Sequence, residues 1–339
     1  MIKNLGFFFL LYLSLSNPVY AKELSTLFEV KIPADQYTNT NDGLNKAFNQ
    51  LIKKLSGSRS KKYLWRIGDA KLKKIDFVSS YSIESFEDSE TLIAQFNAST
   101  LIPELRDLGI PLIGFNRPVI LFLLKVDTGE SKPIFLEDSH TSSSVSSEIV
   151  SILTTIGKER GVYLELPTFD LEDQNLFGQP NILFEPSQYI QDKFYNDGFL
   201  SIQISRVGIN QWSIDGDLQS SSLIREEMLL DFLEEQIHLY LDDFLEVRPL
   251  AAGLLGDEIL LSVHGLKSFQ DFQFVELELD KIFAIKSKQY HLFSPSQIEY
   301  RAQLFQTKDS LLKELRGSSA LIVKSFDDQL NKLTLEYIN

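Results

Sequence analysis

The run of apolar residues between Pro118 and Lys125 constrains the fold more than any other stretch. It holds six consecutive large apolar side chains, Val119 to Leu124, between a proline and a charged residue. A run of this length without alternation is typical of a strand buried on both faces. Such a strand needs helices or a second layer against each face. We therefore predict that Arg117–Asp127 is the central strand of the largest core.

The first 21 residues have the features of a secretory signal peptide. Lys3 supplies a positive charge, Leu5–Leu15 is almost wholly apolar, and small residues end the segment at Ala21. An apolar run of about eleven residues is short for a bilayer span, which favours a cleaved signal over a retained anchor. We predict cleavage after Ala21, export to the periplasm, and no membrane span in the mature chain.

Charge and cysteine content limit the partners. The chain has 339 residues, a net charge of −14 and no cysteine, so disulfides, thiol catalysis and a lipid-modified cysteine are excluded. A chain this acidic is repelled by phosphate backbones and by anionic lipid. We expect no nucleic-acid partner.

The order of elements predicts an α+β / α/β protein with three small mixed domains in series after the signal. Residues 22–112 form an N-terminal α+β domain. Residues 113–248 form a central α/β domain, built on a largely buried sheet with a βαβ unit. Residues 257–339 have the strand-helix-strand-strand-helix-strand order of a ferredoxin-like (split βαβ) domain, after a linker at 249–256.

Periodicity places the individual elements. Apolar side chains at helical spacing from Leu44 to Leu55 predict an amphipathic helix that ends at Gly57. Further helices are expected at 101–108, 186–195, 223–247, 269–283 and 310–316. One more helix is expected to end at Lys158. Strands are expected at 27–32, 77–84, 91–96, 162–166, 199–204, 211–218, 259–263, 284–293, 298–305, 320–324 and 333–338.

Three segments resemble a known family. They are LFEVKIPADQ, FNRPVILFLLKVD and ERGVYLELPTFDLED, in this order. Together they resemble a secreted proteobacterial family catalogued as domain of unknown function number two thousand and sixty-six. Phe122 and Leu123 stand where that family has a tryptophan, and the first helix lacks its early arginine. The resemblance implies export into a Gram-negative envelope and no established activity.

Acidic residues follow two of the predicted central strands. Asp127 ends the first strand, and Asp170, Glu172 and Asp173 follow the second. Ligands of open α/β sheets bind outside the carboxyl ends of strands, where two acids could share a proton or a calcium ion. The favoured alternative is that Asp127 and Asp170 cap turns or helices.

Arg117, which opens the central strand, has two possible roles. It could pair with Asp127 or hold an anionic ligand. The favoured alternative is a structural salt bridge or a simple surface position.

The predicted helix over 223–247 carries many carboxylates and almost no cations. Glu227, Asp231, Glu234 and Glu235 form a weak candidate face for a basic surface of an envelope partner. The favoured alternative is a solvated face. Replacing the four residues with glutamine should then leave stability level or slightly raised, because like-charge repulsion is removed.

No catalytic or cofactor motif is present. The histidines lack the spacing for zinc, and a nucleophile elbow, a phosphate loop and a dinucleotide fingerprint are missing. We expect neither a metal nor a cofactor. The sequence favours an exported, non-enzymatic interaction or accessory module with an unknown envelope protein as partner. The alternative is a secreted hydrolase whose central-domain carboxylates converge in a concave pocket.

Overall fold

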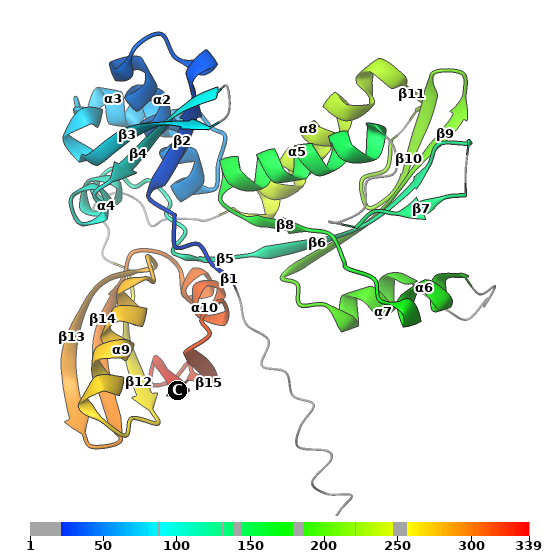
Figure 1. Cartoon of the computed structure of the whole chain (residues 1–339). Helices are drawn as coiled ribbons and strands as arrows, with labels where there is room; N and C mark the ends of the chain where they lie inside the picture. Colours follow the sequence, from blue (N-terminus) through cyan, green and yellow to red (C-terminus); the bar gives the residue numbers. More distant parts are fainter. Residues whose placement is uncertain are drawn as a thin grey trace, which may run out of the picture.

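The computed structural model of the chain describes residues 22–86, 89–130, 132–137, 144–178, 186–220, 222–246 and 256–338. Three sheets with hydrophobic cores form three lobes, which we name first, central and third in chain order. The first and third lobes lie beside each other, and the central lobe extends away from both (Figure 1). The short ladder of β1 (Lys22–Glu23) and β5 (Asn116–Arg117) lies where they meet. The mixed content of helix and strand confirms the predicted α+β class.

The first lobe is an antiparallel sheet of three strands in the order β2-β4-β3, with helices against it. Strand β2 alternates as predicted, because Val30 and Ile32 are buried while Lys31 between them is exposed. The elements of this lobe are β2 (Glu29–Pro33), η1 (Ala34–Gln36), α2 (Thr40–Ser56), α3 (Lys62–Asp69), η2 (Lys74–Phe77), β3 (Val78–Phe86), β4 (Ser89–Phe96) and α4 (Ala98–Asp107).

Helix α2 has the predicted apolar face and the predicted glycine end. Leu44, Phe48 and Leu51 share one face of the helix and are buried in the core of the first lobe. Gly57 follows the helix with a left-handed φ of 62°. A Cβ at Gly57 would lie 2.6 Å from Cδ1 of Ile113, so both backbone conformation and packing require glycine here.

Strand β6 is the central strand of the six-stranded sheet of the central lobe, as predicted. The residues from Val119 to Leu124 are at most 3% exposed. β6 pairs in parallel with β9 on one edge and with β8 on the other, and the helix α5 between β6 and β8 completes the predicted βαβ unit. The strands are β6 (Val119–Asp127), β7 (Ile134–Phe135), β8 (Tyr163–Glu165), β9 (Gly198–Gly208), β10 (Gln211–Gly216) and β11 (Ile224–Arg225).

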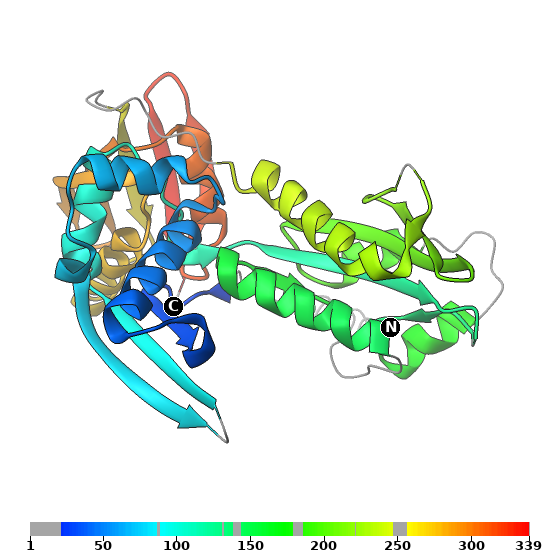
Figure 2. The same ribbon diagram turned by 90° about the horizontal axis from the view of Figure 1, so that it is seen from above.

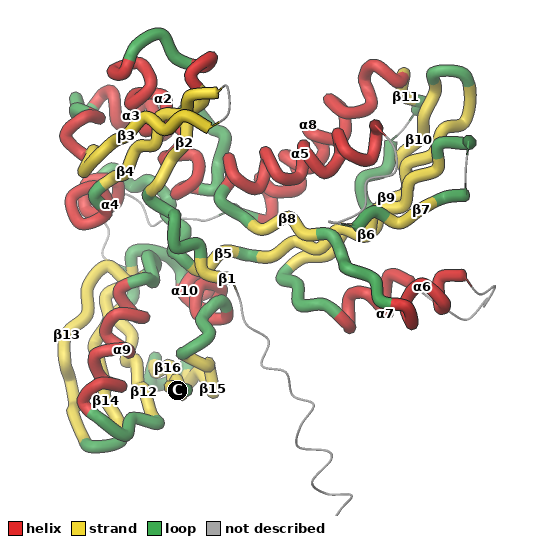
Figure 3. The backbone as a smooth tube through the Cα atoms, viewed as in Figure 1, coloured by secondary structure: helices red, strands yellow, loops and turns green. Residues whose placement is uncertain are grey.

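Helices cover both faces of this sheet, which explains the unbroken apolar run of β6. Helices α5 and α8 lie side by side on the face to which Ile120 and Phe122 point (Figures 2 and 3). Helices α6 and α7 lie on the other face, where Leu121 and Leu123 contact Ile190. The helices are α5 (Ser144–Arg160), α6 (Leu171–Gly178), α7 (Pro186–Lys193) and α8 (Leu229–Phe244).

The acidic helix begins later than predicted. Its helical part covers Leu229–Phe244, whereas the apolar stripe predicted a helix over 223–247. The residues before the 3-10 turn η3 (Glu226–Met228) instead pair with β10, which buries Ile224 in the central core. Leu223 is consequently exposed. At this position, strand pairing and the burial of Ile224 stabilise the chain more than a longer helix would.

The third lobe has the predicted order of elements with one strand inserted. Strand β14 lies between β12 and β13, as a split βαβ unit requires, but β16 lies between β12 and β15 and pairs in parallel with β12. In this inner position β16 buries Leu333, Leu335 and Tyr337, whereas β15 at the edge buries Leu321. The elements are β12 (Glu258–His264), α9 (Phe269–Asp280), β13 (Ile285–Ser294), β14 (Gln297–Leu304), α10 (Lys308–Arg316), β15 (Leu321–Asp327) and β16 (Lys332–Tyr337).

Two buried arginines join the first and central lobes at the end of α2. Arg117 donates to the carbonyl of Lys54 over 2.9 Å, and Arg160 donates to the carbonyl of Gly57 over 2.6 Å. The last carbonyls of a helix lack partners within the helix and carry partial negative charge. The two guanidinium groups therefore satisfy these carbonyls and hold the lobes together.

Polar contacts also hold the third lobe against the first. Arg106 of α4 donates to the carbonyls of Phe283 and Ile285 over 2.9 and 2.6 Å. Glu314 of α10 accepts from the backbone N–H groups of Phe283 and Ala284 over 2.8 and 3.0 Å. Phe283 also packs into the core of the first lobe. The loop between α9 and β13 is thus fixed from two sides.

Several predictions concern residues that the structure does not describe. They are the signal segment 1–21, almost all of the linker 249–256, and His140. The domain boundaries stay predictions. None of the helices within the described ranges is long and apolar enough to cross a membrane.

Candidate binding groove

A large groove separates the first lobe from the central lobe. Its volume is about 1530 Å³. Residues of β2 and α2 line one wall, and residues of α5 and β8 line the other. The walls come from segments far apart in the sequence, so tertiary packing alone creates the groove.

Local patterns decide which side chains face the groove. The apolar stripe of α2 turns into the first core and leaves Lys46 and Lys53 on the groove side. Helix α5 buries its apolar residues against the central sheet and leaves Lys158 and Glu159 on the groove side. Both walls are therefore polar faces of amphipathic helices, each beside an edge strand.

The groove is basic although the chain is acidic. Six lysines and three glutamates line it: Lys22, Lys31, Lys46, Lys53, Lys54, Lys158, Glu29, Glu159 and Glu165. Each glutamate is already in an ion pair with one of these lysines. Lys31 lies 3.5 Å from Glu29, Lys53 lies 2.5 Å from Glu159, and Lys22 contacts Glu165.

Glu159 is the groove carboxylate with a resolved pKa shift. Burial by itself raises the pKa of Glu159, but the hydrogen bond and the charge of Lys53 bring this pKa below its ordinary value. Glu159 is therefore ionised at neutral pH and is not a general acid.

Lys54 has a structural position in the groove. It is 7% exposed and donates to the carbonyls of Thr26 and Glu29 over 2.9 and 3.1 Å. Burial, and next the charge of Arg117, lower the pKa of Lys54 to about 8. A Cβ at Gly161, whose φ is +64°, would lie 2.6 Å from Cγ of Lys54, so the turn into β8 packs directly on this side chain.

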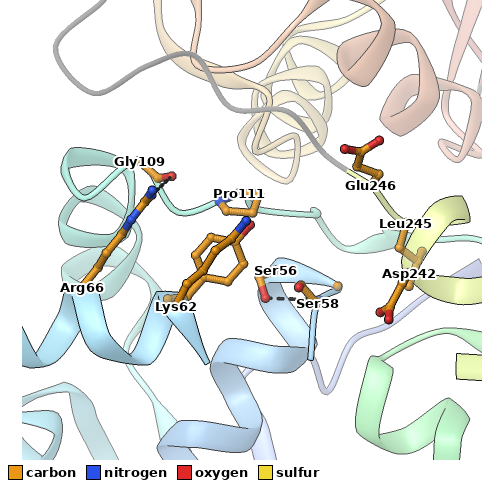
Figure 4. A pocket seen from close by; sticks show the side chains of 11 residues that line it. Ser56, Ser58, Lys62, Arg66, Gly109, Pro111, Asp242, Leu245 and Glu246 are labelled. Carbon is orange, nitrogen blue, oxygen red and sulfur yellow. Dashed lines mark hydrogen bonds between the residues drawn. The ribbon is translucent and has the colours of Figure 1, made fainter. Parts of the chain in front are cut away.

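A second, smaller cavity of about 330 Å³ lies where α8 meets the first lobe (Figure 4). Lys62 and Arg66 border one side, and Asp242 and Glu246 border the other. Arg66 donates to the carbonyl of Gly109 over 3.1 Å. Asp242 accepts from Arg160 of its own lobe over 2.8 Å and from Arg59 of the first lobe over 3.2 Å. It therefore contributes to the contact between the two lobes.

The predicted acidic cluster at the strand ends does not converge on one point. Asp170 and Asp173 accept each other's backbone N–H over 2.9 and 2.8 Å and thereby cap α6. Lys193 contacts both carboxylates over 2.9 and 2.6 Å. Glu172 donates its N–H to Asp170, and Asp127 accepts from the N–H of Gly129. Across the described chain, no hydrogen bond or ion pair joins Asp127 to the other three residues.

Arg117 is buried rather than exposed, at 1%. It donates to the carbonyls of Lys54 and Ile113 over 2.9 and 2.8 Å and makes no contact with Asp127. Burial lowers its pKa to about 9, partly offset by the charge of Glu314, so the guanidinium stays charged at neutral pH. Arg117 joins lobes and does not face either cavity.

The proposed acidic partner face is partly used within the chain. Both oxygens of Glu235 accept from Arg59 of the first lobe, over 2.9 and 3.1 Å. Glu227 pairs with Arg225 over 2.8 Å, and Glu234 lies 3.8 Å from His238. Asp231 is exposed and contacts no described residue. The basic surface that meets this helix in the structure belongs to the first lobe.

The histidines of the described ranges are separate. His238 is buried beside Arg160, with a ring nitrogen 3.3 Å from the guanidinium, and burial together with the charges of the nearby arginines lowers its pKa. His264 contacts Ser262 over 3.1 Å. Among the described residues, no group of three or more histidine, aspartate or glutamate side chains could hold a metal ion.

Comparison with known proteins concerns the first lobe. Residues 21–114 match a domain of unknown function, DUF8605. DUF8605 is a different family from the one that the sequence resembles, and its description names no activity. No curated protein and no solved structure matches the chain. The groove thus borders the matched domain of unknown function on one side and the central sheet on the other.

Sequence reasoning missed the groove residues. The alternation of β2 places Lys31 opposite Val30 and Ile32, and the apolar stripe of α2 leaves out Lys46 and Lys53. Nothing in either pattern indicates that α5 and β8 lie opposite.

Proposed function

We propose that this chain is an exported component of the bacterial cell envelope that acts as a non-enzymatic protein-binding module. The observation that carries the proposal is the groove between β2 and β8. Its volume of about 1530 Å³ exceeds the roughly 300–1000 Å³ of ordinary small-molecule pockets, and two strand edges border it. A segment of a partner protein suits such a site better than a metabolite does.

The carboxylates of the groove also favour binding over hydrolysis. A hydrolase that uses two carboxylates needs one protonated acid and one free base that face each other. In the groove, each of the three glutamates is occupied by a lysine.

Export rests on the segment before Lys22 and on the resemblance to the secreted family numbered two thousand and sixty-six. The matching domain begins at residue 21, the last residue of the predicted signal. The partner in this proposal is an envelope protein rather than a nucleic acid, because a chain with a net charge of −14 repels phosphate backbones.

Two measurements test the proposal. N-terminal sequencing of the protein from the envelope fraction should begin at Lys22, and a chain that keeps Met1 or stays in the cytoplasm contradicts export. Affinity capture with the tagged mature protein, followed by cross-linking, should place partner cross-links on β2, α5 or β8. Cross-links only on the third lobe contradict the groove as the binding site.

A further inference from the structure

The edge of the first sheet is open along the groove. Strand β2 is the outer strand of the order β2-β4-β3, and β4 is its sheet partner. The N–H of Phe96 donates to the carbonyl of Phe28, so the backbone of alternate residues, Val30 and Ile32, faces β4. The N–H and carbonyl of Lys31 then face the opposite way, in the run Glu29–Pro33 that lines the groove.

The opposite wall also ends in an open strand. Within the described sheet, β8 pairs with β6 alone. The N–H of Tyr163 donates to the carbonyl of Pro118, so the backbone of Tyr163 faces β6 and that of Leu164 faces away. Leu164 also lines the groove. Two unpaired strand edges therefore border the same space.

The charge of the groove indicates what kind of segment fits. The lining carries three more lysines than glutamates, in a chain whose net charge is −14. Lys158 of α5 is exposed and forms no hydrogen bond or ion pair with another described residue. Lys46 donates to the carbonyl of Gln36 over 2.5 Å and lies 3.0 Å from Asp42. The ammonium group of Lys158 is therefore available to a carboxylate of a bound chain.

The outward lysine of β2 gives the edge a selective character. A charged side chain on an edge strand repels ordinary apolar strands and so guards against aggregation. A strand that carries carboxylates can instead form an ion pair with this lysine. Main-chain pairing also distinguishes a peptide from a nucleic acid, which has no N–H and carbonyl ladder to offer and is repelled by the rest of the chain.

We propose that the groove binds an extended acidic segment of a partner protein, which adds a strand to β2 while its carboxylates contact Lys31 and Lys158. This inference rests on the proposed function and names its ligand class. Glu29 offers no carbonyl to the new strand, because Lys54 already occupies it. Pairing therefore centres on Lys31.

The test uses a fluorescent peptide of about eight alternating glutamate and valine residues. Two competitors accompany it: the same peptide with lysine for glutamate, and the acidic peptide with N-methylated backbone amides. We expect the mature protein to bind the acidic peptide, with an affinity that falls as salt rises. The lysine peptide should not bind, and N-methylation should weaken binding about tenfold or more. Amide exchange should slow at Lys31.

Two matched variants locate the site. Lys158→Glu reverses an unpaired charge in the last turn of α5 and should weaken peptide binding about tenfold. Lys313→Glu makes the same change in the last turn of α10, away from the groove, and should leave binding unchanged. Far-UV circular dichroism checks that both variants fold.

Other results overturn the inference. Equal binding of the N-methylated peptide means that charge alone acts and no strand forms. Equal loss in both lysine variants means that the groove is not the site. Tighter binding of single-stranded DNA than of the acidic peptide assigns the groove to a polyanion of another class. If envelope capture still cross-links a partner to the groove in these cases, the proposed function stands and only the ligand class is wrong.

Discussion

At the residue scale, the chain places charged groups where lobes meet. Arg117, Arg160 and Glu314 are buried. Arg117 and Arg160 donate across the boundary between the first and central lobes, and Glu314 accepts from the loop of the third lobe that packs on the first. Burying a charge is costly unless hydrogen bonds compensate. In this chain backbone groups supply most of the compensation, so the charges depend on the lobes being correctly docked.

The effect of burying Glu314 can be measured as a change in stability with pH. Burial raises its pKa to about 7 from an ordinary 4.5, although two backbone N–H groups and two arginines act in the opposite direction. Between these pH values the folded state holds a proton that the unfolded state has lost. The free energy of unfolding should therefore fall by on the order of 3 kcal/mol as pH rises from about 4.5 to about 7.

The variant Glu314→Gln removes this titration and keeps the size of the side chain. Urea unfolding at about pH 5 and about pH 7 should show a smaller loss of stability in the variant than in the parent. An identical change with pH in both proteins would mean that Glu314 does not titrate in this window.

At the element scale, β6 tests the central core. Leu121 is 2% exposed on the face covered by α6 and α7. Leu121→Asp places an unpaired carboxylate there and should cost on the order of 4 kcal/mol of unfolding free energy. Leu171→Asp is the control, because Leu171 of α6 is 78% exposed. Melting of the Leu121 variant within a degree or two of the control contradicts a strand buried on both faces.

Helix α8 gives a second test at this scale. The expectation that glutamines on its acidic face leave stability level or slightly raised does not include the ion pair between Glu235 and Arg59. Arg59 belongs to the first lobe, so its two hydrogen bonds to Glu235 help to hold α8 against that lobe. Glu235→Gln should lower the melting temperature slightly at low salt and not at high salt. Asp231→Asn should lower it at neither. In an Arg59→Ala background the effect of Glu235→Gln should vanish.

Local periodicity predicted most elements, and tertiary competition explains the exceptions. The stripe of α2 with Gly57 and the run of β6 follow from spacing alone. The start of α8 does not, because Ile224 gains more from pairing with β10. The inner place of β16 also depends on competition between two strands for one position.

The site was less predictable than the fold. The acidic residues at the strand ends have the capping roles that short-range rules favour, as at Asp170 and Asp173. The groove depends on how two lobes dock, which is decided by contacts such as that from Arg160 to Gly57. No local pattern contains that information.

At the scale of the whole molecule, buried polar contacts join the lobes beside apolar ones, such as the packing of Phe283 and Phe305 into the first core. Arg106 links the first and third lobes through the carbonyls of Phe283 and Ile285, and it stacks 5.7 Å from the ring of Phe305. Burial lowers the pKa of Arg106, and the charge of Glu314 partly restores it. This junction therefore rests on a hydrogen-bonded cation.

Replacing Arg106 with methionine keeps the apolar stem and removes the donors. Two carbonyls of the third lobe then lose their partners, at a cost of about 1–3 kcal/mol each when they stay buried. Opening the junction to water avoids that cost, so the third lobe should move away from the first. Small-angle X-ray scattering should show a larger radius of gyration for Arg106→Met with unchanged far-UV circular dichroism. Arg301→Met is the control, since Arg301 is exposed on β14 and its side chain forms no hydrogen bond or ion pair with a described residue. A radius of gyration equal to that of the control would mean that the apolar contacts around Phe283 hold the lobes without Arg106.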